Sequence, residues 1–352
     1  MPPDGGIIIN ESRERRHGTI WLSSAAKPRC ARHEKQLRPW RVRGLKSAEY
    51  RNMEVSMYSY NTVGELCKLA DENNTGIWEI VLENEVEFLG KPREAVYEEL
   101  KKRFEVMEKS AYKALERPYD TVGNLIRGSA FTQNRYTVEK EGICGSFINR
   151  AMALALSCCE INAAMGKICA APTAGSCGIL PAVLISVQER YKLCEEIVLQ
   201  GMLTASGIGA VVMKNATVAG AEGGCQAECG VAAAMAAAAA VHMCGGTNEM
   251  CANACSFALM NVMGLVCDPV AGLVQLPCAM RNASQTVNAL TSADVALSGA
   301  PCLIPVDEVI EAMYKVGKAL PASLKETADG GLAATMAGKR IQEEIFGSTG
   351  SC

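Results

Sequence analysis

Cysteines give this chain its clearest chemical signal. Cys267 and Cys278 lie eleven positions apart, and the stretch between them contains Asp268-Pro269 and Pro277. Because the residue before a proline is pushed out of the α-helical region, this stretch is predicted to be a loop with a turn at its start. Such a loop can direct two thiolates toward one metal centre, since the thiolate is the form of cysteine that binds metals.

A second cysteine-bearing segment lies upstream and reads GGCQAECG over residues 223–230. The glycines before Cys225 let the backbone come close to a bulky group. Cys225 and Cys229 are four residues apart, so on a helix both could be ligands by spacing alone. The two segments together predict a cysteine-ligated metal cluster.

A third segment, residues 171–181, reads APTAGSCGILP and leads into a helix predicted from Ile179 to about Leu199. Bare N–H groups at a helix start, beside hydroxyl side chains, can bind a small anion such as a carboxylate. The alternative is an ordinary helix cap at Ser176. The segment lacks the spacing and the lysine of a phosphate-binding loop.

The composition predicts a large, mainly helical protein. Of the 352 residues, 49% are hydrophobic and only 5% are aromatic, while small residues are abundant. Strand-like alternation is almost absent, and the net charge of −3 gives no reason to expect nucleic acid as a partner. Seventeen cysteines in a long chain do not suit a small secreted disulfide scaffold, so we expect reduced thiols and a cytoplasmic location, with most thiols in the core.

Apolar periodicity and proline positions predict the helices. Residues 119–142 are predicted to be a loop with short turns. The most apolar run, Val231–Cys244, is too short to span a membrane, and no signal peptide is expected. Helical structure is predicted to begin near Thr62. A long helix is predicted from Lys91-Pro92 to Arg117-Pro118, and another begins after Gly230. Further helices are predicted at Ser146–Ala164, Asn248–Met263, Asn288–Leu297 and Val306–Ala319, and a short last helix ends near Ile345.

The three motifs together resemble the α chain of iron–sulfur-dependent L-serine dehydratase. They read APTAGSCGILP (171–181), AEGGCQAE (221–228) and CDPVAGLVQLPC (267–278), and Arg281-Asn282 fits as well. The resemblance covers roughly Met57 to Gly338. It implies a multi-helix catalytic domain and a substrate site that includes Thr173, Ala174, Gly175, Ser176, Asn215, Arg281 and Asn282.

The resemblance also implies the cofactor and the reaction. A [4Fe–4S] cluster would be held by Cys225, Cys267 and Cys278, with its fourth iron open to polarise the β-hydroxyl of L-serine. Loss of the Cα proton and of water would then give aminoacrylate, which takes up water to form pyruvate and ammonia. Cys229 departs from the family pattern, which usually has an aliphatic residue there. The sequence shows no phosphate cradle with a lysine, so pyridoxal phosphate is not expected.

The general base is not evident from the chain, so its identity stays unknown. His242 is the only histidine in the matched region, and it lies in an apolar helix, where a core role is expected. In the family, a histidine in a Ser-Ser-His-Thr motif belongs to a β component. We therefore expect a separate β chain and an α/β hetero-oligomer that contains no nucleic acid or membrane component.

The resemblance and composition divide the chain into three parts. Residues 1–52 hold twelve basic and five acidic residues, and we expect a disordered extension or a start codon assigned too far upstream. Residues 53–345 form the all-helical catalytic domain, and residues 346–352 form a flexible tail. In some family members a C-terminal cysteine occupies the open iron, which is a role that Cys352 could take.

Two other functions remain open from the sequence. One is a related cluster-dependent lyase that releases sulfide from L-cysteine, which an anaerobic assay with both amino acids would separate. The other is a non-catalytic iron–sulfur scaffold, which would have four protein ligands and no spectral response to serine.

Overall fold

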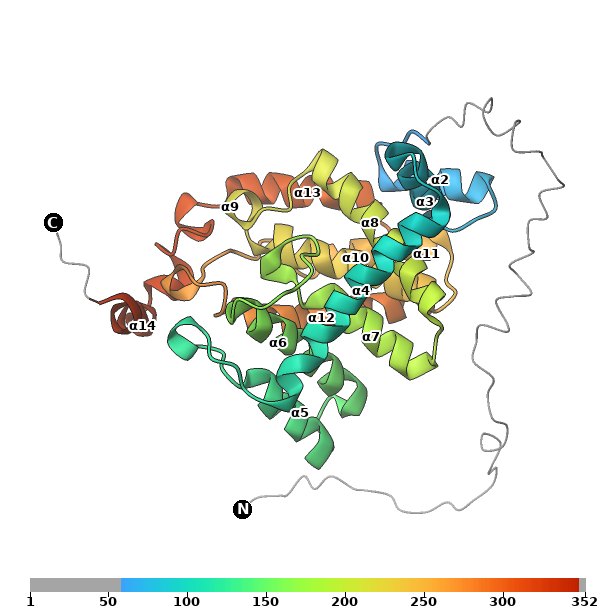
Figure 1. The fold of residues 1–352 in the computed structure, drawn as a ribbon. Helices are drawn as coiled ribbons and strands as arrows, with labels where there is room; N and C mark the ends of the chain where they lie inside the picture. The colour runs from blue at the N-terminus through green and yellow to red at the C-terminus, as the bar shows by residue number, and fades with distance from the viewer. Residues whose placement is uncertain (1–57, 348–352) are drawn as a thin grey trace, which may run out of the picture.

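The computed structural model describes residues 58–347, which form a bundle of α-helices (Figure 1). Within this part of the chain there is no strand, and the one β contact is an isolated bridge between Cys267 and Lys325. The prediction of a mainly α fold is confirmed. The N-terminal extension and Cys352 lie outside the described residues.

The helices are α2 (Val63–Glu72), α3 (Ile77–Leu89), α4 (Arg93–Glu116), α5 (Ser129–Glu139), α6 (Gly145–Ala163), α7 (Ile179–Tyr191), α8 (Glu195–Asn215), α9 (Gly220–Gly223), α10 (Val231–Met243), α11 (Asn248–Met260), α12 (Cys278–Leu297), α13 (Val306–Ala319) and α14 (Met336–Phe346).

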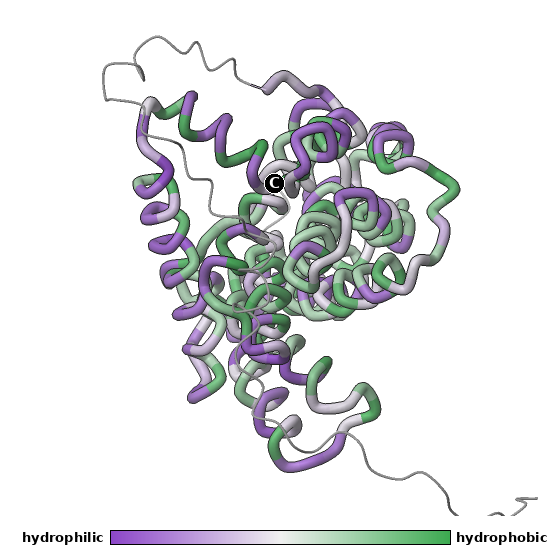
Figure 2. Tube along the Cα trace, turned by 90° about the vertical axis from the view of Figure 1, so that its right-hand side faces the viewer, coloured by the Kyte–Doolittle hydropathy of each residue, from purple (hydrophilic) through white to green (hydrophobic). Residues whose placement is uncertain are grey.

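Helix α10 is the centre of the bundle. All of its residues except His242 are buried, and most are alanines. A helix that is apolar on every face must be covered on every face, and small side chains let its neighbours come close. Helices α7, α8, α11 and α12 all contact it. Figure 2 shows that the helices packed together at the centre are largely hydrophobic.

Helix α8 is the one helix among residues 58–347 that is long and apolar enough, by length and composition, to cross a membrane. However, 78% of its most apolar window is buried inside the fold. A core helix of a large helical domain passes the same test. The apolar run expected to be most prominent, Val231–Cys244, is the shorter helix α10.

Several predicted elements agree closely with the structure. Helix α4 begins directly after Pro92, as predicted, and its stripe of Val96, Leu100, Phe104 and Met107 is buried. Helix α13 has the predicted bounds.

Other predicted elements are wrong. The single helix expected from Ile179 is split into α7 and α8, because Lys192 adopts a left-handed conformation (φ 51°) and ends α7. The expected loop at 119–142 contains α5, of which only Ala130 is buried, so it shows no apolar stripe. Helix α12 begins at Cys278, well before the predicted start at Asn288.

Candidate functional site

Cys225 lies at a sharp turn between α9 and the central helix α10. Gly224 takes φ 77°, and a Cβ there would lie 2.7 Å from the Leu265 carbonyl oxygen, so this close approach requires glycine. The next residues, Gln226–Gly230, form a π-helical turn, a rare form that is frequent at functional sites. The Gln226 N–H donates to the Leu265 carbonyl at 3.0 Å, which joins this turn to the segment that leads to Cys267.

Cys267 is held by the backbone on one side and by an ion pair on the other. Its N–H donates to the Leu324 carbonyl at 2.9 Å. From α12, Arg281 donates to the Val266 carbonyl at 2.8 Å and to Asp268 Oδ1 at 2.7 Å. Asp268 is buried, and its other oxygen accepts the Leu332 N–H at 2.7 Å. These contacts fix both neighbours of Cys267.

Cys278 is the first residue of α12, and Asn282 lies one turn further along this helix. Asn282 is 0% exposed. Its amide nitrogen donates to the carbonyls of Cys278 at 2.9 Å and Gly175 at 2.7 Å, and its oxygen accepts the Gly178 N–H at 2.9 Å. Asn282 therefore fastens the loop at 173–178 to the start of α12.

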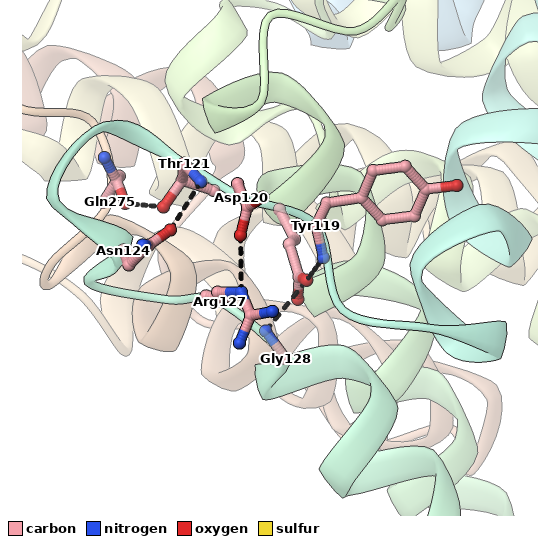
Figure 3. Close-up of polar contacts among 8 residues, drawn as sticks. Tyr119, Asp120, Thr121, Asn124, Arg127, Gly128 and Gln275 are labelled. Carbon is pink, nitrogen blue, oxygen red and sulfur yellow. Dashed lines mark hydrogen bonds and ion pairs between the residues drawn. The ribbon is translucent and has the colours of Figure 1, made fainter.

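The middle of the Cys267–Cys278 loop is anchored to a different part of the chain (Figure 3). Thr121 Oγ1 donates to Gln275 Oε1 at 2.7 Å, and Gln275 Nε2 donates to the Val122 carbonyl at 2.7 Å. The anchoring loop is itself held at Gly128, whose N–H donates to the buried Glu160 carboxylate at 2.9 Å. Both ends and the middle of the cysteine loop thus have fixed partners.

The site contains a carboxylate that the sequence did not single out. Thr173 Oγ1 donates to Glu228 Oε1 at 2.8 Å, and the Cys267 thiol lies 4.0 Å from Glu228 Oε2. A Cβ on Gly220 would lie 2.7 Å from Glu228 Oε2 and 3.0 Å from Cys267 Sγ. Glu228 therefore joins the loop at 173–176 to the cysteine segments. The available signal was its position three residues after Cys225, in the same helical turn.

The three predicted ligand thiols lie in one electrostatic environment. Burial raises the pKa of Cys278 to about 12, with further contributions from the negative charges of Cys225 and Glu228. Burial also raises the pKa of Cys267, and the same two negative charges follow in importance. The pKa of Cys225 is instead lowered, first by a hydrogen bond from the Cys229 side chain and also by the charge of Arg281.

Burial likewise raises the pKa of Glu228, partly offset by the hydrogen bond from Thr173. The nearby charge of Glu326 raises it further. Thiols and carboxylate therefore disfavour one another's charged forms, which is the situation that a bound cationic centre relieves.

The segment predicted to bind a carboxylate forms a single tight turn. Thr173 and Ser176 cap each other, with their hydroxyl oxygens 3.2 Å apart, and Ser176 is buried. The N-cap of this turn is Thr173 and the N-cap of α7 is Gly178, so the alternative of an ordinary helix cap at Ser176 is wrong. Within residues 58–347, the N–H groups of Ala174 and Gly175 have no hydrogen-bond partner in the protein.

Asn215 and His242 have partners outside this site. Asn215 is exposed at the end of α8 and donates to the Asn61 carbonyl at 2.5 Å. His242 lies at the far end of α10 from Cys225, and a helix of this length spans about 20 Å. Its Nε2 is 3.4 Å from Gln200 Oε1, and with Trp78 it lines a cavity of about 410 Å³. His242 is only partly buried, so the expected core role is wrong, and its position at the other end of α10 separates it from Cys225.

Comparison with known proteins gives one consistent result. The family model described as "Serine dehydratase alpha chain" matches residues 72–333. The chain is 47% identical over 286 residues to the L-serine dehydratase α chain of Peptoniphilus asaccharolyticus, covering 81% of this chain and 98% of that one. It is 43% identical over 288 residues to the probable L-serine dehydratase α chain of Bacillus subtilis, covering 82% and 96%.

The chain belongs to the serine dehydratase α-chain family. It is also 37% identical over 289 residues to L-serine dehydratase TdcG of Escherichia coli, a longer protein of which the match covers 62%. All three motifs and every hydrogen bond of the Cys267–Cys278 loop described above lie within the matched residues.

The donors that this site offers to a metal group are the three thiols of Cys225, Cys267 and Cys278. Among the residues that the structure describes, no group of three histidine, cysteine or acidic side chains is placed to hold one metal ion. In a [4Fe–4S] cluster each cysteine binds a different iron, so the sulfurs need not converge on one point. Cys225 and Cys267 are buried and Cys278 is partly buried, and the charges of Cys225 and Cys278 both act on the Cys267 thiol, so three thiols from three segments are available to such a group.

Proposed function

We propose that this chain is the α subunit of an L-serine dehydratase that converts L-serine to pyruvate and ammonia. The observation that supports the proposal is the link that Glu228 makes between the turn at Thr173 and the Cys267 thiol, on which the charges of Cys225 and Cys278 also act. Family membership and the names of the relatives support the reaction.

The cofactor is a [4Fe–4S] cluster held by Cys225, Cys267 and Cys278. When bound, a cluster with one iron free of protein thiolates supplies a Lewis acid for the β-hydroxyl group of serine. The protein orients the three thiols through the Gly224 turn, the Arg281–Asp268 ion pair and Asn282. Pyridoxal phosphate has no part in this proposal.

The substrate carboxylate binds at the turn that contains Thr173 and Ser176, where the N–H groups of Ala174 and Gly175 can donate to it. Arg281 and Asn282 act on the substrate indirectly. Asn282 is fully buried and uses both ends of its amide on the protein, and Arg281 is bound to Asp268. We assign them the role of positioning the loops that contact the substrate.

The general base comes from a separate β chain, and the complex works in the cytoplasm. Two relatives are named α chains, and the longer relative has additional sequence beyond the match. The described cysteines are all free, which supports a reducing compartment.

The test is an anaerobic assay of the reconstituted chain, with and without its β chain, on L-serine and on L-cysteine. Pyruvate formation from serine, dependent on the β chain and accompanied by ammonia, is the expected result. Sulfide release from cysteine at a higher kcat/KM would identify a desulfidase instead. Iron binding without turnover of either amino acid in the complex would indicate a scaffold.

A further inference from the structure

The two buried carboxylates among residues 58–347, Glu160 and Asp268, each have several donors. Glu160 is 0% exposed and accepts three backbone N–H groups, from Tyr119 at 2.7 Å, Gly128 at 2.9 Å and Ala130 at 3.3 Å. Asp268 has the guanidinium of Arg281. This is the expected pattern, because a charge removed from water is costly unless it is paired or hydrogen-bonded.

Glu228 is partly buried and has fewer protein donors than these two carboxylates. Its one ordinary hydrogen bond comes from the Thr173 hydroxyl at 2.8 Å, and its second oxygen has only the Cys267 thiol at 4.0 Å. Once Cys267 is a thiolate bound to metal, it has no proton left to donate. Among residues 58–347, no ion pair involves Glu228. The nearby cation, Arg281, is already bound to Asp268.

Two glycines let this carboxylate lie close to the backbone. A Cβ on Gly175 would lie 3.1 Å from Glu228 Oε1, and a Cβ on Gly220 would lie 2.7 Å from Oε2. Neither contact could be accommodated without a shift of the glutamate. Gly175, whose N–H has no partner within residues 58–347, is therefore also the residue whose backbone lies against Glu228 Oε1.

We propose that Glu228 binds the α-ammonium group of the amino-acid substrate and so selects amino acids over the corresponding acids without nitrogen. This inference rests on the proposed function. The ammonium group supplies the positive charge and the donors that Glu228 lacks, and Thr173 fixes the direction of the carboxylate. The substrate carboxylate then lies at the neighbouring turn, so one amino acid is held at two of its groups.

The test compares two ligands that differ only in the ammonium group and cannot lose water, L-alanine and propionate. Their affinities are measured by anaerobic calorimetry on the cluster-loaded α/β complex of wild type, Glu228→Gln and Glu228→Asp. Glu222→Gln is the matched control, because Glu222 is an exposed glutamate on the neighbouring helix α9. Iron content is measured on every sample.

Glu228→Gln should weaken L-alanine about 10- to 100-fold, the range expected for a lost hydrogen bond to a charged group. Propionate should bind as in wild type or more tightly, Glu228→Asp should retain a preference for alanine, and Glu222→Gln should match wild type. An equal loss for both ligands, or no loss, would overturn the assignment, and loss of iron in Glu228→Gln would make Glu228 part of the metal site. Serine turnover by wild type tests the proposed function separately.

Discussion

The four cysteines nearest the site have different surroundings, and this difference leads to a prediction at the scale of single residues. Replacing Cys225, Cys267 or Cys278 by serine should reduce iron from about four per chain to near zero and abolish serine turnover, because each thiolate holds a different iron. Cys302→Ser is the control, since Cys302 bonds only to the nearby Ile304 carbonyl. Iron analysis and the pyruvate assay provide the measurement. A variant of the three that keeps its iron would remove that cysteine from the ligand set.

Cys229 should behave differently from its neighbour Cys225. It is buried, its hydrogen bond goes to Cys225, and Asn282 Nδ2 lies 3.9 Å from its sulfur. Cys229→Ala should therefore retain the cluster, with full iron content and a stability loss of about 1 kcal/mol for the lost packing and hydrogen bond. If Cys229→Ala binds no iron while Cys225→Ala does, then Cys229 rather than Cys225 is the ligand from this turn.

Single residues were predicted from the sequence where a motif marked them. Glu228 contacts both Thr173 and the Cys267 thiol, while the role of the three cysteines as ligands stays a prediction. Glu228 was missed, because a glutamate in a helical turn usually faces solvent, and only the fold brings it to Thr173 and Cys267. Asn282 was expected to contact the substrate, whereas the structure shows it buried among backbone groups.

At the scale of elements, the hydrogen bonds of Asn282 connect α12 to the turn before α7, and this connection can be tested. Asn282→Ala would leave the Gly178 N–H and the Gly175 carbonyl without their partner and should cost roughly 2 to 4 kcal/mol of unfolding free energy. Thermal or denaturant unfolding measures this cost, with the exposed Ser284 of the same helix, changed to alanine, as control.

The same variant should also raise KM for serine, because the turn at Thr173 loses its fixed position. A stability loss as small as that of Ser284→Ala would show that Asn282 does not join the two elements.

A helix could be predicted from the sequence where its buried apolar residues recur with the helical period. Helix α4 has such a stripe and was placed correctly. The first turns of α12 were missed because Arg281 and Asn282 are held there by hydrogen bonds and an ion pair rather than by apolar contact. The break between α7 and α8 depends on one left-handed residue, Lys192, which no periodicity reveals.

At the scale of the whole molecule, the proposed function assigns the ligands and the substrate turn to the described chain and the base to a partner. Its one histidine beyond the N-terminal extension, His242, lies at the other end of α10. The α chain alone should therefore bind iron and produce no pyruvate, while the α/β complex should be active. Activity of the α chain by itself would contradict the two-chain account.

A cluster with three cysteine ligands would leave one iron for substrate or for Cys352 of the tail. Mössbauer spectroscopy of the ⁵⁷Fe-loaded α/β complex, frozen before and after addition of L-serine, tests it most directly. In wild type and in Cys352→Ser, we predict that one iron in four changes its parameters when serine is added, and that the two proteins differ before addition if the tail occupies that iron. Four irons that stay unchanged with serine in both proteins would contradict the account.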